Sequence, residues 1–308
     1  MTGAPPPPVP GLADQAWLGT AVVALCSVCF GLVPFFARSL TEAGIAAPAI
    51  AFFRYLFPAV AFLPFLRLRG AEGRASLWGY VSGFCVGLGW LGYVLALDRM
   101  PVSTAGVLYM TYPMFTLVFA WAFFADRPAP RAMAGGVLIL IAAVLASRPS
   151  TAGQPLTAVS ILLGLAAPLS FGLAINVTAN KLAILPPLSR VAVFALGSAT
   201  GLVPLIATYP VAEVLPADGA QWALVVGLAV LTALLPQLLY TTFVPKIGGA
   251  KAAALGSIEL PTMFAVGWLA FAEPLGPREA AAGALVLTAI LMTPARRRPP
   301  ASQPGTAA

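Results

Sequence analysis

The chain has 308 residues, of which 60% are hydrophobic and only 9% are charged, whereas a soluble domain usually carries about 25% charged residues. Its mean hydropathy is +0.92, so polar groups cannot cover its surface, and we expect an integral membrane protein. The net charge of +7 does not indicate nucleic-acid binding, because the basic residues lie in short gaps between apolar runs, as in membrane proteins.

Several kinds of chemistry are excluded by composition. The sequence has no histidine, which rules out histidine-based triads, metal ligands and pH switches. Cys26 and Cys29 form a C-x-x-C inside an apolar run with no second pair nearby, so we interpret them as packing residues. There is no P-loop, no G-x-S-x-G and no cluster of acids, and we therefore expect no enzyme, no cofactor and no metal.

In chain order, residues 1–16 are rich in proline and lack the basic start of a signal peptide, so we expect a disordered tail. The rest divides into ten apolar segments of roughly 18–25 residues, the length that crosses ~30 Å of hydrocarbon. They lie near 17–37, 47–66, 77–97, 102–124, 130–147, 156–180, 188–209, 220–243, 250–272 and 277–294. We predict an all-α integral membrane protein with ten transmembrane helices.

The second half of the chain repeats the first. Tyr93 aligns with Tyr240 at an offset of 147 residues, Pro113 with Pro261 at 148, and Phe30-Gly31-Leu32 recurs as Phe171-Gly172-Leu173 at 141. A long repeat of apolar residues indicates two halves that are built alike. The predicted parts are a five-helix repeat at 17–148, a linker at 149–155, a second five-helix repeat at 156–295 and a basic disordered tail at 296–308.

The distribution of Lys and Arg predicts the orientation. With the N-terminus in the cytoplasm, twelve of the seventeen basic residues lie inside and four outside, and Arg54 lies within a segment, as the positive-inside rule requires. Five crossings per half is an odd number, so the two repeats are inverted and both termini are cytoplasmic. Fourteen of the basic residues are arginine, as is common in GC-rich bacterial genomes, and we expect the bacterial cytoplasmic (inner) membrane.

Glu259 is the candidate for the working centre. It lies nine residues into the segment at 250–272 and two residues before Pro261. An ionised carboxylate that faced lipid at that depth would cost ~2–3 kcal/mol or more, so we expect it to face the interior. There it would couple protons or bind a cationic cargo; the alternative is a brace for the Pro261 kink. Its repeat equivalent is Thr111.

Other residues complete the candidate site. Pro113 and Pro261 occupy matching places, where each leaves a carbonyl free to contact cargo or to act as a hinge, or makes a plain kink. Arg54 can pair with Glu259, bind a carboxylate or phosphate, or anchor the structure, and anchoring is the favoured interpretation. The remaining polar and aromatic residues of the expected lining are Trp90, Tyr93, Tyr109, Tyr112, Asn176, Gln237, Tyr240 and Ser257.

Together with the ten inverted segments, three features of the sequence resemble the drug/metabolite transporter superfamily, and specifically its EamA branch. They are Arg54, the Tyr112-Pro113 step, and the turns Ala125-Asp126-Arg127-Pro128 and Ala272-Glu273-Pro274. The chain departs from the family at these turns, where Gly-Glu is more frequent, and at Phe30-Gly31, where Trp-Gly is common. The resemblance covers about 17–295 and implies carriage of small polar metabolites across a cytoplasmic membrane, often outward.

We therefore expect a secondary transporter, and more specifically an exporter, of a small polar or amphipathic metabolite such as an amino acid, working by alternating access. The expected partners are a small-molecule substrate and the lipid bilayer, with no nucleic acid; proton coupling and a homodimer are left open. A passive facilitator or channel is the alternative, and an intramembrane enzyme is less favoured.

Overall fold

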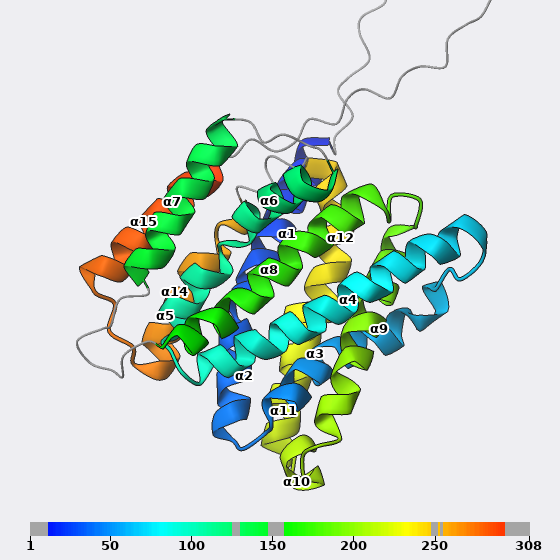
Figure 1. Ribbon diagram of the computed structural model, residues 1–308, viewed down its shortest axis with the longest axis horizontal. Coiled ribbons are helices and arrows are strands. Elements are labelled where there is room, and N and C mark those ends of the chain that lie inside the picture. The colour runs from blue at the N-terminus through cyan, green and yellow to red at the C-terminus, as the bar shows by residue number, and fades with distance from the viewer. Residues whose placement is uncertain (1–11, 125–129, 147–156, 248–251, 253–254, 293–308) are drawn as a thin grey trace, which may run out of the picture.

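The computed structural model describes residues 12–124, 130–146, 157–247, 252 and 255–292, which form a tilted bundle of helices with no strand in these ranges (Figure 1). The first half contains α1 (Leu12–Gly31), α2 (Val33–Glu42), α3 (Ala47–Phe62), the 3₁₀ turn η1 (Leu63–Phe65), α4 (Gly70–Leu97), α5 (Val102–Tyr109), α6 (Tyr112–Phe124) and α7 (Pro130–Ala146). The second half contains α8 (Ala158–Asn180), α9 (Pro187–Ile206), α10 (Val211–Val214), α11 (Gly219–Ala229), the π-helical turn η2 (Val230–Leu234), α12 (Leu235–Ile247), α14 (Glu259–Phe271) and α15 (Pro277–Met292).

Within the described ranges, seven stretches of helix are long and apolar enough to cross a membrane. They are Trp17–Glu42, Ala47–Phe65, Gly70–Leu97, Val102–Phe124, Ala158–Asn180, Pro187–Ile206 and Gly219–Val244. The other three predicted segments fall on α7, α14 and α15, which have 17, 13 and 16 residues. The chain is thus an all-helical, multi-pass membrane protein, and the count of ten spans stays a prediction.

Several of the predicted segments are interrupted just before a proline. The helix breaks at Leu32 before Pro34, at Met110–Thr111 before Pro113, and at Ser257–Ile258 before Pro261. Proline disfavours the helical conformation of the preceding residue and cannot donate to the i−4 carbonyl, but it fits the first turn of a new helix. By contrast, Pro58 and Pro168 lie inside the continuous helices α3 and α8.

Small residues bring the helices of the two halves together. A Cβ at Gly83 or Gly87 of α4 would collide with the backbone oxygen of Phe194 or Ser198 of α9. In return, the Ser198 hydroxyl donates to the Gly83 carbonyl at 2.8 Å. The backbones therefore touch, which is how membrane helices associate without long side chains between them. At one edge of the bundle, α7 and α15 lie side by side (Figure 1).

One predicted boundary is wrong. Helix α1 begins at Leu12, so residues 12–16 are helical rather than part of a disordered tail. After Pro10-Gly11 these residues are mostly good helix formers, and the tail's proline-rich composition does not extend to them. The predicted linker at 149–155, the predicted tail at 296–308 and the turn at Ala125–Pro128 lie outside the described residues.

Candidate functional site

A row of aromatic rings runs through the centre of the bundle. Trp90 and Tyr93 of α4 contact each other with ring centroids 5.0 Å apart, and each lies 5.7 Å from Tyr109 at the end of α5. The row continues to Tyr112, the first residue of α6, at 5.8 Å. Phe171 of α8 closes it, 5.3 Å from Tyr112 and 6.3 Å from Tyr109. The four predicted aromatic residues of the first half are therefore one cluster, held by three segments of the chain.

Arg54 of α3 lies at the Trp90 end of this row. Its guanidinium carbon is 4.0 Å from the Trp90 ring centroid, an arrangement in which the ring face attracts the cation. Two of its nitrogens donate to Thr232, one to the hydroxyl and one to the carbonyl, both at 3.2 Å. The Arg54 Nε is buried without a hydrogen-bond partner. Arg54 thus joins α3 to η2 and keeps one unused donor.

The carbonyl that Arg54 contacts belongs to a local defect in the helix. Thr232 lies in η2, a single π-helical turn between α11 and α12. Such turns loosen the regular hydrogen bonding of a helix and often occur at functional sites. The Thr232 hydroxyl itself donates to the Leu228 carbonyl at 2.6 Å. Because its hydrogen is used in this bond, the hydroxyl oxygen accepts from the Arg54 guanidinium.

Glu259 follows the helix break at Ser257–Ile258 and is the first residue of α14. Its carboxylate lies within electrostatic range of Tyr93, Tyr109, Tyr112 and Tyr240 and of Arg54. Across the described residues, however, the carboxylate forms no ion pair with Arg54 and no hydrogen bond. The Arg54–Glu259 pair, one of the alternatives for Arg54, is thus absent among the described residues, and the acid stays partly accessible. The positive end of the α14 dipole favours its negative charge there.

The two predicted hinges occupy equivalent positions in their helices. Pro113 is the second residue of α6 and Pro261 the third residue of α14, so both stand in the first turn, where the missing N–H breaks no helical bond. The break therefore precedes each proline instead of coinciding with it.

The remaining predicted lining residues are spread more widely. Tyr240 of α12 contacts Phe30 of α1, with ring centroids 6.1 Å apart, and lies within electrostatic range of Tyr112. Ser257 lies in the turn that precedes Glu259, and Gln237 lies partly buried on α12. Asn176 is outside the cluster: its amide donates to the Thr116 carbonyl at 2.9 Å and the Gly172 carbonyl at 3.0 Å, and so braces α8 against α6.

Two members of the cluster were missed at the level of sequence. Phe171 belongs to the repeated Phe-Gly-Leu triplet, and this repeat could have indicated a place for it in the site. Its equivalent in the first half, Phe30, also contacts a tyrosine of the predicted site. Thr232 carried no signal that sets it apart from other threonines in apolar segments. Only the fold brings it to Arg54.

A buried acid, Glu273, closes one end of the bundle. Glu273 follows α14, and its carboxylate accepts from Arg38 of α2 at 2.6 Å and from the backbone N–H groups of Val102 at 2.8 Å and Ser103 at 3.4 Å. It therefore caps α5 and holds α2 at the same time. The Arg38 guanidinium also covers the Phe271 ring at 4.5 Å. The sequence analysis named Glu273 only as part of the turn Ala272-Glu273-Pro274, which carries the resemblance to the family.

Comparisons with known proteins agree with this architecture. The family model of EamA-like transporters matches residues 17–148. A solved crystal structure, described only as that of a protein, matches with a TM-score of 0.62 and 17% identity over 90% of this chain and 96% of that chain, which supports the fold alone. No curated protein matches the chain. Residues 17–148 therefore match the EamA-like transporter family, which is part of the drug/metabolite transporter superfamily.

Proposed function

We propose that this protein is a secondary exporter of a small zwitterionic metabolite, such as an amino acid, and that it works by alternating access between two inverted repeats. The observation that carries the proposal is Glu259, an acid at a helix break inside an apolar bundle, which has no hydrogen-bond or ion-pair partner among the described residues. Such an acid needs a positive charge to be stable in the membrane. A proton or the amine of a cargo can supply it.

Arg54 supplies the complementary charge. Its Nε has no partner, so it can donate to a carboxylate without breaking the bonds to Thr232. Between Arg54 and Glu259 the aromatic row offers apolar faces and the unpartnered hydroxyl of Tyr93. A molecule with an amine, a carboxylate and a short apolar body fits these three features, and the Glu259 side attracts its amine.

Helix pairing supports the inverted repeats. Helix α1 packs on α12 and α14, and its twin α8 packs on α4 and on α6. Gly31 of α1 approaches Glu259 and Thr262 of α14, and Gly172 of α8 approaches Phe115 and Thr116 of α6. Each half therefore contacts the interrupted helix of the other half through the same glycine, as expected of a carrier whose halves exchange conformations.

Glu273 is proposed to hold the predicted outer end of the bundle closed, and in this sense it is the latch of an outer gate. It joins α2, α5 and the end of α14 at the predicted outer end, so opening that end requires its bonds to break. The residue at an offset of 141 from Arg38 is Ala179, which cannot form the same ion pair at the other end. The two gates are thus proposed to differ in strength.

The test is counterflow in proteoliposomes, with and without a proton gradient. A neutral amino acid is compared with its methyl ester, which lacks the carboxylate, and with its N-acetyl form, which lacks the amine; nucleosides and cationic drugs complete the screen. We expect the zwitterion to be carried best. Glu259→Gln is expected to lower its flux roughly 10- to 100-fold, because a hydrogen bond to a charged group is worth about 1.5–3 kcal/mol.

Glu213→Gln is the matched control, since Glu213 is an exposed acid outside the site, and it should transport like the wild type. Equal flux and equal pH dependence in Glu259→Gln and the wild type would remove Glu259 from the mechanism. Carriage of the ester and the N-acetyl form at the same rate as the zwitterion would contradict the charge pairing. Downhill flux that no gradient can drive uphill would make the protein a facilitator.

A further inference from the structure

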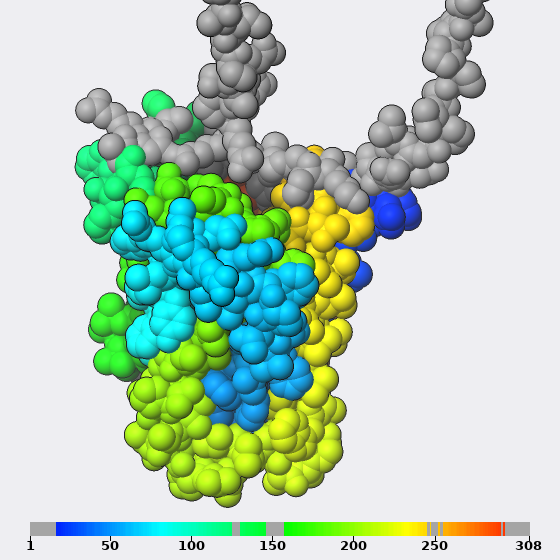
Figure 2. Space-filling view, turned by 90° about the vertical axis from the view of Figure 1, so that its right-hand side faces the viewer, coloured from blue at the N-terminus to red at the C-terminus, as the bar shows by residue number. Residues whose placement is uncertain are grey.

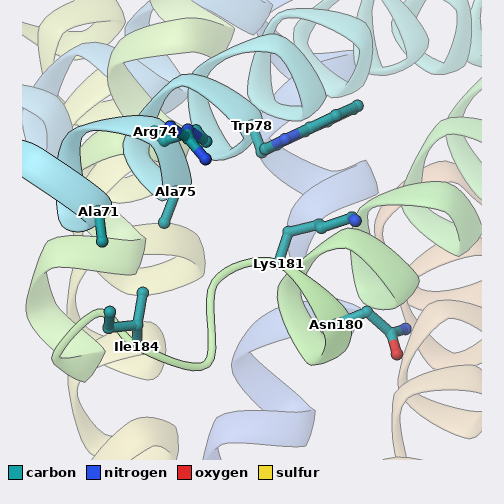
Figure 3. Close-up of a pocket in the computed structure, with 7 residues that line it drawn as sticks. All are labelled: Ala71, Arg74, Ala75, Trp78, Asn180, Lys181 and Ile184. Carbon is teal, nitrogen blue, oxygen red and sulfur yellow. The ribbon is translucent and has the colours of Figure 1, made fainter.

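A pocket of about 280 Å³ lies away from the central site, between the start of α4 and the end of α8 (Figure 3). Its lining comes from Ala71, Arg74, Ala75 and Trp78 on one side and from Asn180, Lys181 and Ile184 on the other. The four α4 residues follow the spacing i, i+3, i+4 and i+7, so they form one face of that helix. None of the predicted transport residues lines it.

Two positive charges in this pocket are uncompensated. Arg74 and Lys181 are both exposed, and neither forms an ion pair in the part of the chain that the structure describes. The Lys181 ammonium lies 5.7 Å from the Trp78 ring centroid, and Figure 3 shows its side chain extending beneath Trp78. Glu72 is the acid nearest in sequence, but it lies two residues from Arg74 and so on the other side of α4. The pocket is therefore suited to an anion.

The surroundings indicate where that anion comes from. The side chains of Trp78, Ile184 and Leu77 are 48%, 55% and 62% exposed. They form an apolar surface near the ends of the long apolar helices α4 and α8. Tryptophan concentrates at the level of lipid headgroups. On the space-filling surface, the sky-blue start of α4 and the green of α8 are neighbours (Figure 2). A free anion would need none of this apolar rim, whereas a phospholipid would cover it.

We propose that this pocket binds the phosphate of an anionic phospholipid, with Arg74 and Lys181 as its ligands and Trp78 packed on the glycerol and upper acyl chain. Basic pockets between membrane helices on the cytoplasmic side bind acidic headgroups in this way. The volume is roughly nine times the ~30 Å³ of one water molecule, enough for a phosphate with its glycerol. Because α4 and α8 come from different halves of the chain, the bound lipid joins the two halves.

The test uses the full-length protein in detergent and three probes: dioleoyl-phosphatidylglycerol, dioleoyl-phosphatidylcholine and inorganic phosphate. Native mass spectrometry and thermal unfolding are expected to show one retained phosphatidylglycerol and a raised midpoint, with no comparable effect of the other two probes. The double variant Arg74→Gln/Lys181→Gln should lose at least tenfold in phosphatidylglycerol affinity. The charge-preserving variant Arg74→Lys/Lys181→Arg should retain it.

The matched control is Arg69→Gln/Arg131→Gln, which removes two exposed charges outside the pocket and should bind phosphatidylglycerol like the wild type. If the pocket variant fails to fold, the wild type and Trp78→Phe are compared in liposomes that contain brominated phosphatidylglycerol or brominated phosphatidylcholine. Stronger quenching of Trp78 by the anionic lipid supports the proposal. Equal quenching, equal binding of both lipids, an equal effect of phosphate, or phosphatidylglycerol loss in the control variant would each overturn it.

Discussion

The interrupted helix of the first half and that of the second half share a backbone design but differ in chemistry. Both break just before a proline, at Met110–Thr111 and at Ser257–Ile258. At the first break, the Thr111 hydroxyl donates to the Leu108 carbonyl at 2.6 Å, and the residue is 1% exposed. At the second break, Glu259 begins α14 as a partly accessible acid that has no partner in the part of the chain that the structure describes.

This difference separates two requirements of a carrier. The shared backbone, with a new helix N-terminus beside the aromatic row, can support similar movements of both halves. The charge is present in one half only. In the proposed alternating-access mechanism, the similar backbones of the two breaks would serve the conformational change, and the single acid would serve recognition of the cargo.

The largest effect on stability is expected from moving the acid to the first break. Thr111→Glu would bury a carboxylate without a partner, which should lower the free energy of unfolding by about 3–5 kcal/mol. Thermal unfolding in detergent measures this loss. The reverse change, Glu259→Thr, should retain stability and abolish transport. A Thr111→Glu protein as stable as the wild type would show that the two breaks have equivalent surroundings.

A smaller effect is expected at the far end of α14, where Arg38 has two acidic partners. Glu273→Gln removes the buried one, with a side chain 9% exposed, and should lower the free energy of unfolding by about 1.5–3 kcal/mol. Glu42→Gln removes the other partner, whose carboxylate lies 3.1 Å from the Arg38 Nε and whose side chain is 58% exposed. This change should alter the free energy of unfolding by less than about 1 kcal/mol. Denaturation midpoints of the two variants provide the measurement. Equal losses would argue against a latch at Glu273.

A smaller effect than that of Glu273→Gln is expected from the twin glycines, Gly31 and Gly172. An added Cβ at Gly31 would lie 2.5 Å from the Thr262 Cβ, and one at Gly172 would lie 2.8 Å from the Phe115 Cβ. We expect Gly31→Ala and Gly172→Ala each to lower stability by about 1–2 kcal/mol through overpacking. Unequal losses, measured by thermal unfolding, would mean that the two halves do not use this contact alike. Gly219→Ala is the control, because nothing lies within 4 Å of a Cβ there.

Much of the architecture was predictable from the chain alone. The charged fraction and the lengths of the apolar segments indicated a membrane bundle, because each span must bury its own backbone hydrogen bonds in hydrocarbon. The repeat and the prolines indicated a hinge or kink at Pro113 and Pro261, and a helix break precedes each of them. The aromatic residues singled out for the site, Trp90, Tyr93, Tyr109 and Tyr112, lie in contact. These are local properties of composition and spacing.

Partners between distant segments were decided only by the tertiary structure. Arg54 contacts Thr232 rather than Glu259, Glu273 reaches Arg38 and α5, and Asn176 braces two helices instead of joining the aromatic row. Side chains on apolar helices can point in any direction around the helix axis, and their partners depend on how the helices pack. That packing is set by close backbone approaches at glycines such as Gly83 and Gly87, and no local pattern encodes them.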